Sequence, residues 1–263
     1  MSRKSQTPVL AALPPVDHDV PRAIVAFARN RPEGLKVPLH THPRAELVYS
    51  ARGTVTMSAE EGSWVAPPER AIWVPAGVRH STRHSVGTEV RIVFVRTDAV
   101  PGLPTRCAIM QVSPLLRELL LAVMDLPTLY DEDGADGRLV RVLLDRIAVL
   151  PEEPLHLPMP ASRNLRAIAT ELAESPGVPL AEAAREAAMS PRSFARHFQA
   201  ETGLSFGAWQ RQAQLLRALE LLGAGLRVGD VAFTLGYDST SAFIAMFRRA
   251  FGTTPTRYFE ASK

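Results

Sequence analysis

Hydrophobic positions follow two periods along the chain and predict a strand-rich part followed by a helical part. Between Val20 and about Arg96, short runs rich in Val, Ile, Trp, Phe and Thr alternate with glycine and proline, as in AIVAFA, ELVYSARGTVTMS, GSWVAPPERAIWVPAGVRHS and EVRIVFV. Strands at this spacing predict an antiparallel barrel or sandwich. Beyond them, SPLLRELLLAVMDL and GRLVRVLLDRIAVL carry apolar residues at helical spacing. Two helices are therefore expected over 113–125 and 137–150, where they cap the barrel.

A proline-rich stretch separates the strand-rich part from the rest of the chain. PEEPLHLPMPAS, residues 151–162, has four prolines in twelve residues, and proline removes a backbone donor and disfavours helix in its predecessor. The stretch therefore predicts an extended linker. The expected fold class is α+β, with a flexible N-terminus (1–19), a barrel domain (20–150), the linker (151–162) and an all-α domain (163–263).

The helical part contains a near-duplicate with an offset of 49 residues. SPRSFARHFQAETG and STSAFIAMFRRAFG match at Ser190/Ser239, Phe194/Phe243, Phe198/Phe247 and Gly203/Gly252. Two phenylalanines four residues apart share one helix face, and a glycine shortly after them is typical of a helix end. Small residues upstream, Ala184 and Ala232, let a second helix cross closely, as in a helix-turn-helix. The repeat therefore predicts two helix-turn-helix units, with a plain helical bundle as the alternative.

The whole helical array, from SPRSFARHF to the terminal FGTTPTRYF, resembles the DNA-binding domain of AraC-type transcriptional regulators. The resemblance covers about a hundred residues. It implies two helix-turn-helix units joined by a long helix at about 206–222, which enter successive major grooves on one face of double-stranded DNA.

The resemblance also implies which residues contact DNA. The recognition helices are expected at Pro191–Thr202 and Ser239–Ala250. The expected base-facing residues are Arg192, Ala195 and Arg196 in the first helix, and Thr240, Ser241, Ile244 and Ala245 in the second. Arg196 is favoured because arginine pairs bidentately with guanine, and the alternative for it is a solvated surface arginine. Apolar Ile244 and Ala245 predict weaker sequence reading in the second half, with phosphate contacts from Arg248 and Arg249.

The first domain contains a histidine-rich motif. The first motif of cupin barrels is matched by the stretch GLKVPLHTHPRAELVYSARG, at Gly34, His40, His42, Glu46 and Gly53. Part of the second motif is present in PAGVRH, which contains His80. Glu69 stands where that second motif has a glycine, and His84 where it has an asparagine. The resemblance implies a cupin-like sensor domain.

Strand geometry explains why such a motif can hold a metal. Side chains alternate along a strand, so His40 and His42 point the same way, and Glu46 joins them if the connection stays extended. His80 is expected from a facing strand. Three imidazoles and a carboxylate suit Zn, Fe, Mn or Ni. The alternatives are satisfied core histidines, or an organic effector bound without a divalent transition metal.

Three further side chains in the barrel domain have open roles. His84 is either a partner that orients a metal ligand or an exposed strand residue. Trp64 and Trp73 are expected in the core or in a pocket wall, rather than in an aromatic ligand box.

Composition narrows the class of protein. The chain has 263 residues, 46% apolar and 22% charged, which is typical of a folded soluble protein. Its longest apolar stretch, LLRELLLAVM, is too short to cross a bilayer, and the N-terminus lacks a secretory signal. The single cysteine, Cys107, suits a reducing compartment. A cytoplasmic protein without membrane contact is expected.

Charge is unevenly distributed. Residues 1–159 contain 18 Lys/Arg and 18 Asp/Glu, and residues 160–263 contain 12 and 9, so the net charge of +3 lies in the last part. A surplus there is consistent with a polyanionic partner.

A regulator accounts for both domains, so an enzyme is not expected. A metal-dependent cupin enzyme, such as a dioxygenase or isomerase, explains only the barrel, and a constitutive DNA binder explains only the helices. A small-molecule or metal effector and a homodimer formed through helices 113–125 and 137–150 are expected, although those helices could merely cover the barrel. One stretch of the helical part is similar to a subgroup of AraC-type regulators that often control neighbouring efflux transporter genes. This stretch is ALELLGAGLRVGDVAFTLGYDSTSAFIAMFRRAFGTTP.

Overall fold

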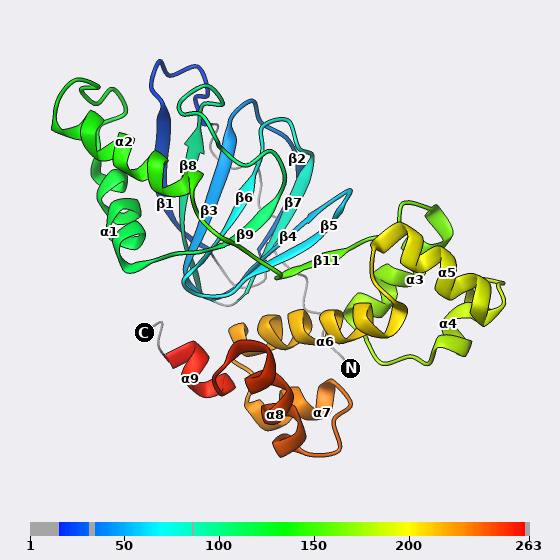
Figure 1. The fold of residues 1–263 in the computed structure, drawn as a ribbon. Helices are drawn as coiled ribbons and strands as arrows, with labels where there is room; N and C mark the ends of the chain where they lie inside the picture. Colours follow the sequence, from blue (N-terminus) through cyan, green and yellow to red (C-terminus); the bar gives the residue numbers. More distant parts are fainter. Residues whose placement is uncertain (1–15, 32–34, 86, 261–263) are drawn as a thin grey trace, which may run out of the picture. The chain divides into compact units, whose positions relative to one another are not determined.

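The computed structural model describes residues 16–31, 35–85 and 87–260, and it confirms the expected α+β class (Figure 1). Among the described residues, nine strands come first in the chain, two α-helices follow, and two short strands precede the remaining helices; the strands form two antiparallel sheets. The chain divides into two compact units. The first holds the described residues up to Met57 together with Trp64–Pro154, and the second holds Ser58–Ser63 and the chain from Leu155 onward. Among the described residues, no helix has the length and apolarity needed to span a membrane.

The strands form a six-stranded and a five-stranded sheet. The first has the order β1 (Ile24–Arg31), β8 (Thr88–Val95), β3 (Ala45–Arg52), β6 (Arg70–Val74), β9 (Ala108–Gln111) and β10 (Glu152–Glu153). The second has the order β11 (His156–Pro158), β5 (Gly62–Ala66), β4 (Val55–Ala59), β7 (His80–His84) and β2 (Lys36–His40). This is the expected cupin-like architecture.

The two faces of the larger sheet have different tasks. On β3, Leu47 and Tyr49 pack into a core that includes Trp73 and Val93. The alternate residues Glu46 and Val48 line a cavity instead, because successive side chains on a strand point to opposite faces.

Two helices cover the outer face of the larger sheet, close to the predicted positions. α1 (Pro114–Ala122) continues into a short 3-10 helix (Val123–Asp125), and α2 spans Ala135–Ala148. Ser113 caps α1, with its Oγ accepting from the Leu116 backbone N–H, as a serine–proline start predicts. Their buried leucines join the core that contains Trp73. Trp73 and Trp64 are both buried and neither lines the cavity, so they are core residues.

Strand β9 was not predicted. AIMQ is short and follows a stretch rich in proline and glycine, so it has no periodic signal of its own. It is a strand because it pairs with β6, Ile109 opposite Ile72.

The proline-rich stretch 151–162, expected as an extended linker, contains two short strands that pair in the sheets. β10 pairs with β9, and Glu153 forms an ion pair with Arg70 at 2.7 Å. In the second unit, the Met159 backbone N–H donates to the Glu61 carbonyl, and the Trp209 indole Nε1 donates to the Pro158 carbonyl. Backbone pairing therefore holds much of this stretch in place.

The second unit contains the predicted helical repeat. Its helices are α3 (Arg163–Glu174), α4 (Leu180–Glu186), α5 (Pro191–Thr202), α6 (Phe206–Gly223), α7 (Val228–Thr234), α8 (Thr240–Phe251) and α9 (Pro255–Glu260). α5 and α6 lie within one residue of prediction, and α8 begins one residue later than predicted because Ser239 is its N-cap.

The landmarks of the repeat have the predicted local roles. Ser190 and Ser239 each cap a recognition helix through their Oγ, and Gly203 and Gly252 end these helices with φ of 76° and 73°. The four matched phenylalanines are fully buried, as are Ala184 and Ala232 in the preceding helices. α4 packs on α5 and α7 on α8. The repeat therefore forms two helix-turn-helix units joined by α6.

Candidate functional site

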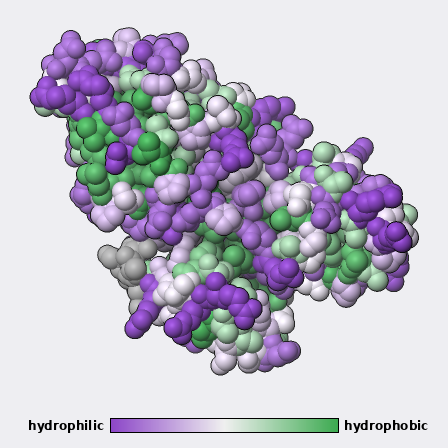
Figure 2. Space-filling view, in the orientation of Figure 1, coloured by the Kyte–Doolittle hydropathy of each residue, from purple (hydrophilic) through white to green (hydrophobic). Residues whose placement is uncertain are grey.

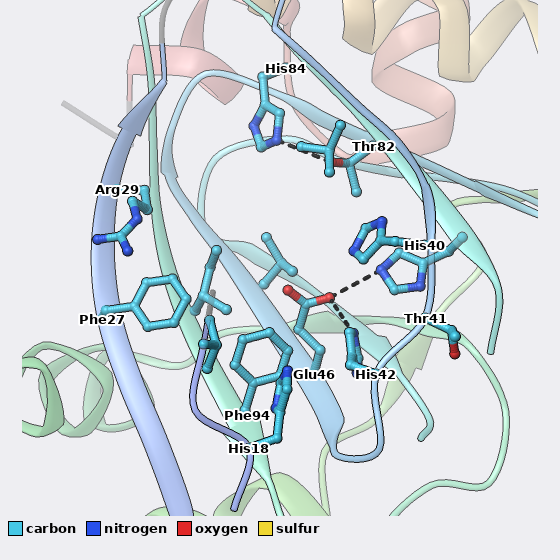
Figure 3. Close-up of a pocket in the computed structure, with 15 residues that line it drawn as sticks. His18, Phe27, Arg29, His40, Thr41, His42, Glu46, Thr82, His84 and Phe94 are labelled. Carbon is cyan, nitrogen blue, oxygen red and sulfur yellow. Dashed lines mark hydrogen bonds and ion pairs between the residues drawn. The ribbon is translucent and has the colours of Figure 1, made fainter. Parts of the chain in front are cut away.

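A cavity of about 160 Å3 lies inside the barrel (Figure 3). Alternate residues of the strands form most of its wall: Phe27 and Arg29 of β1, Glu46 and Val48 of β3, His80, Thr82 and His84 of β7, and Ile92 and Phe94 of β8. The strict alternation follows from the pleat, which sends every second side chain inward.

The four predicted metal ligands come together at one side of this cavity. The ligand nitrogens of His40, His42 and His80 lie within 4.8 Å of one another. Glu46 Oε2 lies 3.2 Å from Nε2 of His42 and 3.2 Å from Nε2 of His80. The set that the sequence motif predicted is therefore a spatial cluster.

The way in which two of the histidines reach the cluster differs from the prediction. His80 was expected from a facing strand, but it lies directly opposite His40 in the β2–β7 pair of the same sheet. His42 was expected on a strand with His40, but β2 ends at His40 and β3 begins at Ala45, so His42 lies in a loop. A loop carries no alternation rule, and hydrogen bonds position His42 instead.

Backbone carbonyls orient all three imidazoles. Nδ1 of His40 lies 2.9 Å from the Pro38 carbonyl, Nδ1 of His42 2.5 Å from the Arg44 carbonyl, and Nδ1 of His80 3.0 Å from the Val78 carbonyl. A carbonyl oxygen only accepts, so each Nδ1 must donate. In the neutral ring the proton then sits on Nδ1, and Nε2 presents a lone pair. Histidines that ligate metals are commonly oriented in this way.

The electrostatics of the cluster require a positive charge between these groups. Burial by itself raises the pKa of Glu46, but the close contacts with the imidazoles of His42 and His80, and the positive charge these can carry, outweigh burial and lower that pKa to about 2. Burial lowers the pKa of His80, but its contact with Glu46 outweighs burial and raises it. A carboxylate facing imidazole lone pairs is stable only with a proton or a cation between them.

The donor set fits a divalent transition metal. His80 Nε2 is buried and is not aligned for a hydrogen bond, despite its 3.2 Å approach to Glu46. His40, the more open of the three histidines, has a pKa lowered by burial and so favours the neutral, ligating form. Three imidazole nitrogens and one carboxylate are ligands that such ions prefer, and a bound ion would replace the proton that His80 shares with Glu46.

A segment that the sequence predicted to be flexible contributes to the cavity wall. Of the predicted flexible residues 1–19, residues 1–15 lie outside the described residues. His18 lines the cavity, with its ring stacked 5.8 Å from His42 and edge-on to Phe94 at 4.8 Å. Arg44 holds this segment, because its buried guanidinium donates to the carbonyls of His18, Val20 and Arg22 at 2.9, 2.5 and 2.9 Å. No motif in the sequence indicates these contacts.

A cation lies on the opposite wall from the histidines. The Arg29 guanidinium stacks 4.3 Å from the Phe27 ring centroid, across the cavity from His40 (Figure 3). Within the described ranges, no carboxylate pairs with it. The alternation of AIVAFARNR, with Phe27 and Arg29 on the same face, is the signal that could have indicated it.

His84 is a wall residue. Its side chain is 3% exposed and lines the cavity, and its Nε2 lies 3.2 Å from Thr82 Oγ1. The alternative of an exposed strand residue is therefore wrong.

Glu69 replaces the glycine of the second cupin motif and keeps that glycine's backbone conformation. Its φ is 61°, in the left-handed region that favours glycine. Its carboxylate accepts from the Tyr49 hydroxyl at 2.9 Å and lies 3.8 Å from the Arg117 guanidinium. These contacts give the residue a role that a glycine lacks.

The residues expected to contact DNA lie on the outer faces of their helices. Arg192 and Arg196 of α5, and Thr240, Ser241, Ala245, Arg248 and Arg249 of α8, are exposed, whereas Ala195 and Ile244 are partly buried. The buried phenylalanines occupy the opposite faces. Arg192, Arg196, Arg248 and Arg249 have no carboxylate partner in the part of the chain that is described. They therefore form unneutralised basic positions on the two helices.

Comparison with known proteins identifies both domains. The family described as AraC-like ligand binding domain matches residues 23–185, and the family described as helix-turn-helix domain matches residues 183–261. The chain is 39% identical over 240 residues to the HTH-type transcriptional regulator NimR of Escherichia coli, covering 90% of this chain and 87% of that protein. It is 27% identical to the HTH-type transcriptional activator RhaR of Pectobacterium carotovorum, covering 89% and 90%.

Among solved structures, the DNA-binding domain of AdpA in complex with a target DNA is 29% identical, covering 38% of this chain and 93% of that one with a TM-score of 0.35. The match of the ligand-binding domain covers more than half of the chain, and NimR is similar over nearly its full length. The chain therefore belongs to the AraC family of HTH-type transcriptional regulators.

Proposed function

We propose that occupancy of the barrel cavity by an effector changes the affinity of the helix-turn-helix domain for specific promoters, in the cytoplasm. The supporting observation is that one chain carries a cavity lined by polar groups and two recognition helices with unneutralised arginines. A ligand can shift DNA binding only if it binds one of two arrangements more tightly than the other. The proposal therefore requires a difference in affinity, which a titration measures.

The test uses a duplex that the chain itself selects from a random-sequence pool. Its affinity is measured by fluorescence anisotropy with and without Zn²⁺, Mn²⁺, Ni²⁺ or Fe²⁺, and with a panel of small metabolites. A reproducible change in affinity for the selected duplex, absent for a scrambled one, supports the proposal. A chain that binds the selected duplex unchanged under every condition is a constitutive binder.

Within the DNA-binding domain, we assign different tasks to the two recognition helices. The base contacts of α5 come from Arg192, Ala195 and Arg196. Arg196 supplies the main contact with guanine, because its planar guanidinium can donate to both O6 and N7 of that base. Thr240, Ser241, Ile244 and Ala245 of α8 read bases less sharply, because two of the four cannot hydrogen-bond through their side chains. Arg248 and Arg249, at the end of α8, contact phosphates.

Substitutions test this division. Arg196→Ala is expected to reduce discrimination between selected and scrambled duplexes by about 1–3 kcal/mol. Arg249→Ala is expected to weaken both duplexes equally and to flatten the dependence of log affinity on log salt by about one unit. Identical responses of the two variants would rule out the assignment.

The cluster of His40, His42, Glu46 and His80 is proposed to hold a divalent transition metal. The ion would supply a Lewis-acidic position with room for an effector atom. The chain's own residues orient the cluster through the Nδ1 hydrogen bonds and surround it with the apolar side chains of Val48, Ile92 and Phe94.

Metal analysis of the purified chain tests this part. The wild type is expected to bind about one equivalent of ion and to gain thermal stability from it, whereas His42→Ala loses both. His84→Ala is the matched control, because His84 lines the same cavity outside the cluster. Metal content no higher in the wild type than in His42→Ala rejects the site.

The same cluster keeps one rival function open to experiment. A cupin with three histidines and a glutamate can carry out dioxygenase or isomerase chemistry, so turnover of a bound compound by the metal-loaded chain would favour an enzyme. The regulators among its relatives favour sensing instead.

We propose a neighbouring efflux transporter gene as the target of the regulator. Transcript levels of that gene in a strain that lacks the regulator would test this.

The barrel domain is also proposed to form a homodimer. Leu115 of α1, Val142 of α2, and the flanking Leu129 and Val149 are exposed hydrophobic residues, and hydrophobic surface gathers over this side of the barrel domain (Figure 2). A dimer would present two DNA-binding domains, each with two recognition helices, to repeated half-sites on DNA.

A further inference from the structure

The cavity contains an unbalanced positive charge. Among the described residues, Arg29 and Glu46 are the only Arg, Lys, Asp or Glu residues in its wall. Glu46 is already engaged by His42 and His80 at 3.2 Å each. Arg29 has no carboxylate partner among residues 16–31, 35–85 and 87–260, and its one described hydrogen bond is a 3.2 Å donation to the carbonyl of the preceding residue, Ala28. Most of its five N–H donors therefore remain available.

Phe27 fixes the orientation of this guanidinium. The ring lies 4.3 Å from the Arg29 Cζ, a stacking distance at which the guanidinium keeps its edge free for a planar partner. The fork geometry of arginine matches a carboxylate bidentately. An anion with two coplanar oxygens is thus the group that completes this wall.

The rest of the cavity suits one aromatic ring. Phe94, Val48, Ile92 and Val37 supply apolar wall, and Phe94 meets the His18 and His42 rings edge-on. The volume of about 160 Å3 is close to the roughly 150 Å3 of an engineered protein cavity that binds benzene.

From these observations we propose that the cavity takes a small planar anion, a single aromatic ring that bears a carboxylate, with the carboxylate paired to Arg29. The proposal rests on the proposed role of this cavity as the effector site and names the chemical class of its ligand. Arg29 sets the requirement for charge, and the apolar wall sets the requirement for size.

The test compares benzoate with benzamide, which has the same shape without the charge. Binding to the full chain is measured by isothermal titration calorimetry after chelator treatment, so that a bound ion cannot account for affinity for the anion. Benzoate is expected to bind at least about ten-fold more tightly than benzamide, as for hydrogen bonds to a charged group. Cyclohexanecarboxylate, which keeps the charge and loses the planarity, is expected to bind more weakly than benzoate.

Variants of Arg29 identify the source of the preference. Arg29→Gln is expected to abolish the difference between benzoate and benzamide, and Arg29→Lys to retain part of it, because lysine keeps the charge and loses the fork. Arg52→Gln, at an arginine with 74% exposed side chain outside the cavity, is expected to match the wild type. Thermal melting of each variant checks that it is folded.

Several results would overturn the assignment: no benzoate binding by the wild type, equal or tighter binding of benzamide, or an unchanged preference in Arg29→Gln. A separate measurement addresses the proposed function. If benzoate binds through Arg29 but leaves the affinity for the selected duplex unchanged, the ligand class stands and the effector-responsive regulator fails. If metal ions alter DNA binding while benzoate does not bind, the regulator stands and the anion site fails.

Discussion

Single residues decide how the cavity is built, and Arg44 is the clearest case. Its guanidinium, in a residue only 4% exposed, donates to three carbonyls of the segment that carries His18, while its own carbonyl orients His42. One residue therefore links the chain segment over the cavity to the histidine cluster. The motif that contains Arg44 was evident in the sequence, but its partners were not, because the carbonyls it contacts lie 22 to 26 positions away.

Replacing Arg44 by methionine is expected to lower the free energy of unfolding by about 3 kcal/mol, because one buried and two partly buried carbonyls lose a charged donor. Urea unfolding measures the change. Arg52→Met is the control: its side chain is 74% exposed and 4.0 Å from Glu89, so a change within about 0.5 kcal/mol is expected. Equal effects of the two substitutions would mean that the three hydrogen bonds do not stabilise the fold.

Glu69 offers a second prediction at the residue scale. Glu69→Ala keeps a side chain at φ 61° and loses the Tyr49 and Arg117 contacts, whereas Glu69→Gly loses the same contacts and relieves the backbone. Glu69→Gly is therefore expected to be more stable than Glu69→Ala by about 1 kcal/mol. Paired urea titrations check this, and an alanine variant as stable as the glycine variant would contradict it.

At the scale of elements, the helices were predicted better than the strands. The recognition helices lie within one residue of prediction because serine caps, phenylalanine spacing and terminal glycines are local signals. Strand β9 and the pairing of β10 depend on partners distant in sequence, Ile72 for Ile109 and Met110 for Glu152. Hydrophobic period alone does not identify such partners.

Replacing glycine by alanine is expected to lower stability where a left-handed glycine ends a recognition helix, and to raise it inside helix α6. Gly252→Ala places a Cβ at φ 73°, which is expected to cost about 1 kcal/mol or more. Gly207→Ala lies inside α6, where the new Cβ would meet only Arg211 Nη1 at 3.6 Å, so it is expected to stabilise by about 0.5–1 kcal/mol. Thermal melting of both variants tests the pair; destabilisation by both would contradict this account of α6.

At the scale of the whole molecule, the proposed dimer gives the sharpest prediction. Leu115→Glu combined with Val142→Glu is expected to convert a dimer into a monomer in sedimentation, because each substitution places a charge in an apolar interface. Phe233→Glu is the matched control, since Phe233 of α7 is 84% exposed and lies outside α1 and α2. A wild-type chain that sediments as a monomer with and without DNA removes the dimer from the proposal.

The sequence by itself determined that a strand-rich part precedes a helical part, and it indicated the two helix-turn-helix repeats and the four members of the histidine–glutamate cluster. The first two features depend on hydrophobic period and local spacing, which the chain order records directly, and the members of the cluster followed from the resemblance to two cupin motifs. Only the tertiary structure decided that His80 pairs with His40 in one sheet, that His42 is oriented from a loop, and that Arg44 holds His18 beside the cluster. It alone placed Arg29 on the opposite wall without a carboxylate partner within the described residues. These facts depend on strand pairing and on hydrogen bonds between segments distant in sequence, which local spacing does not encode.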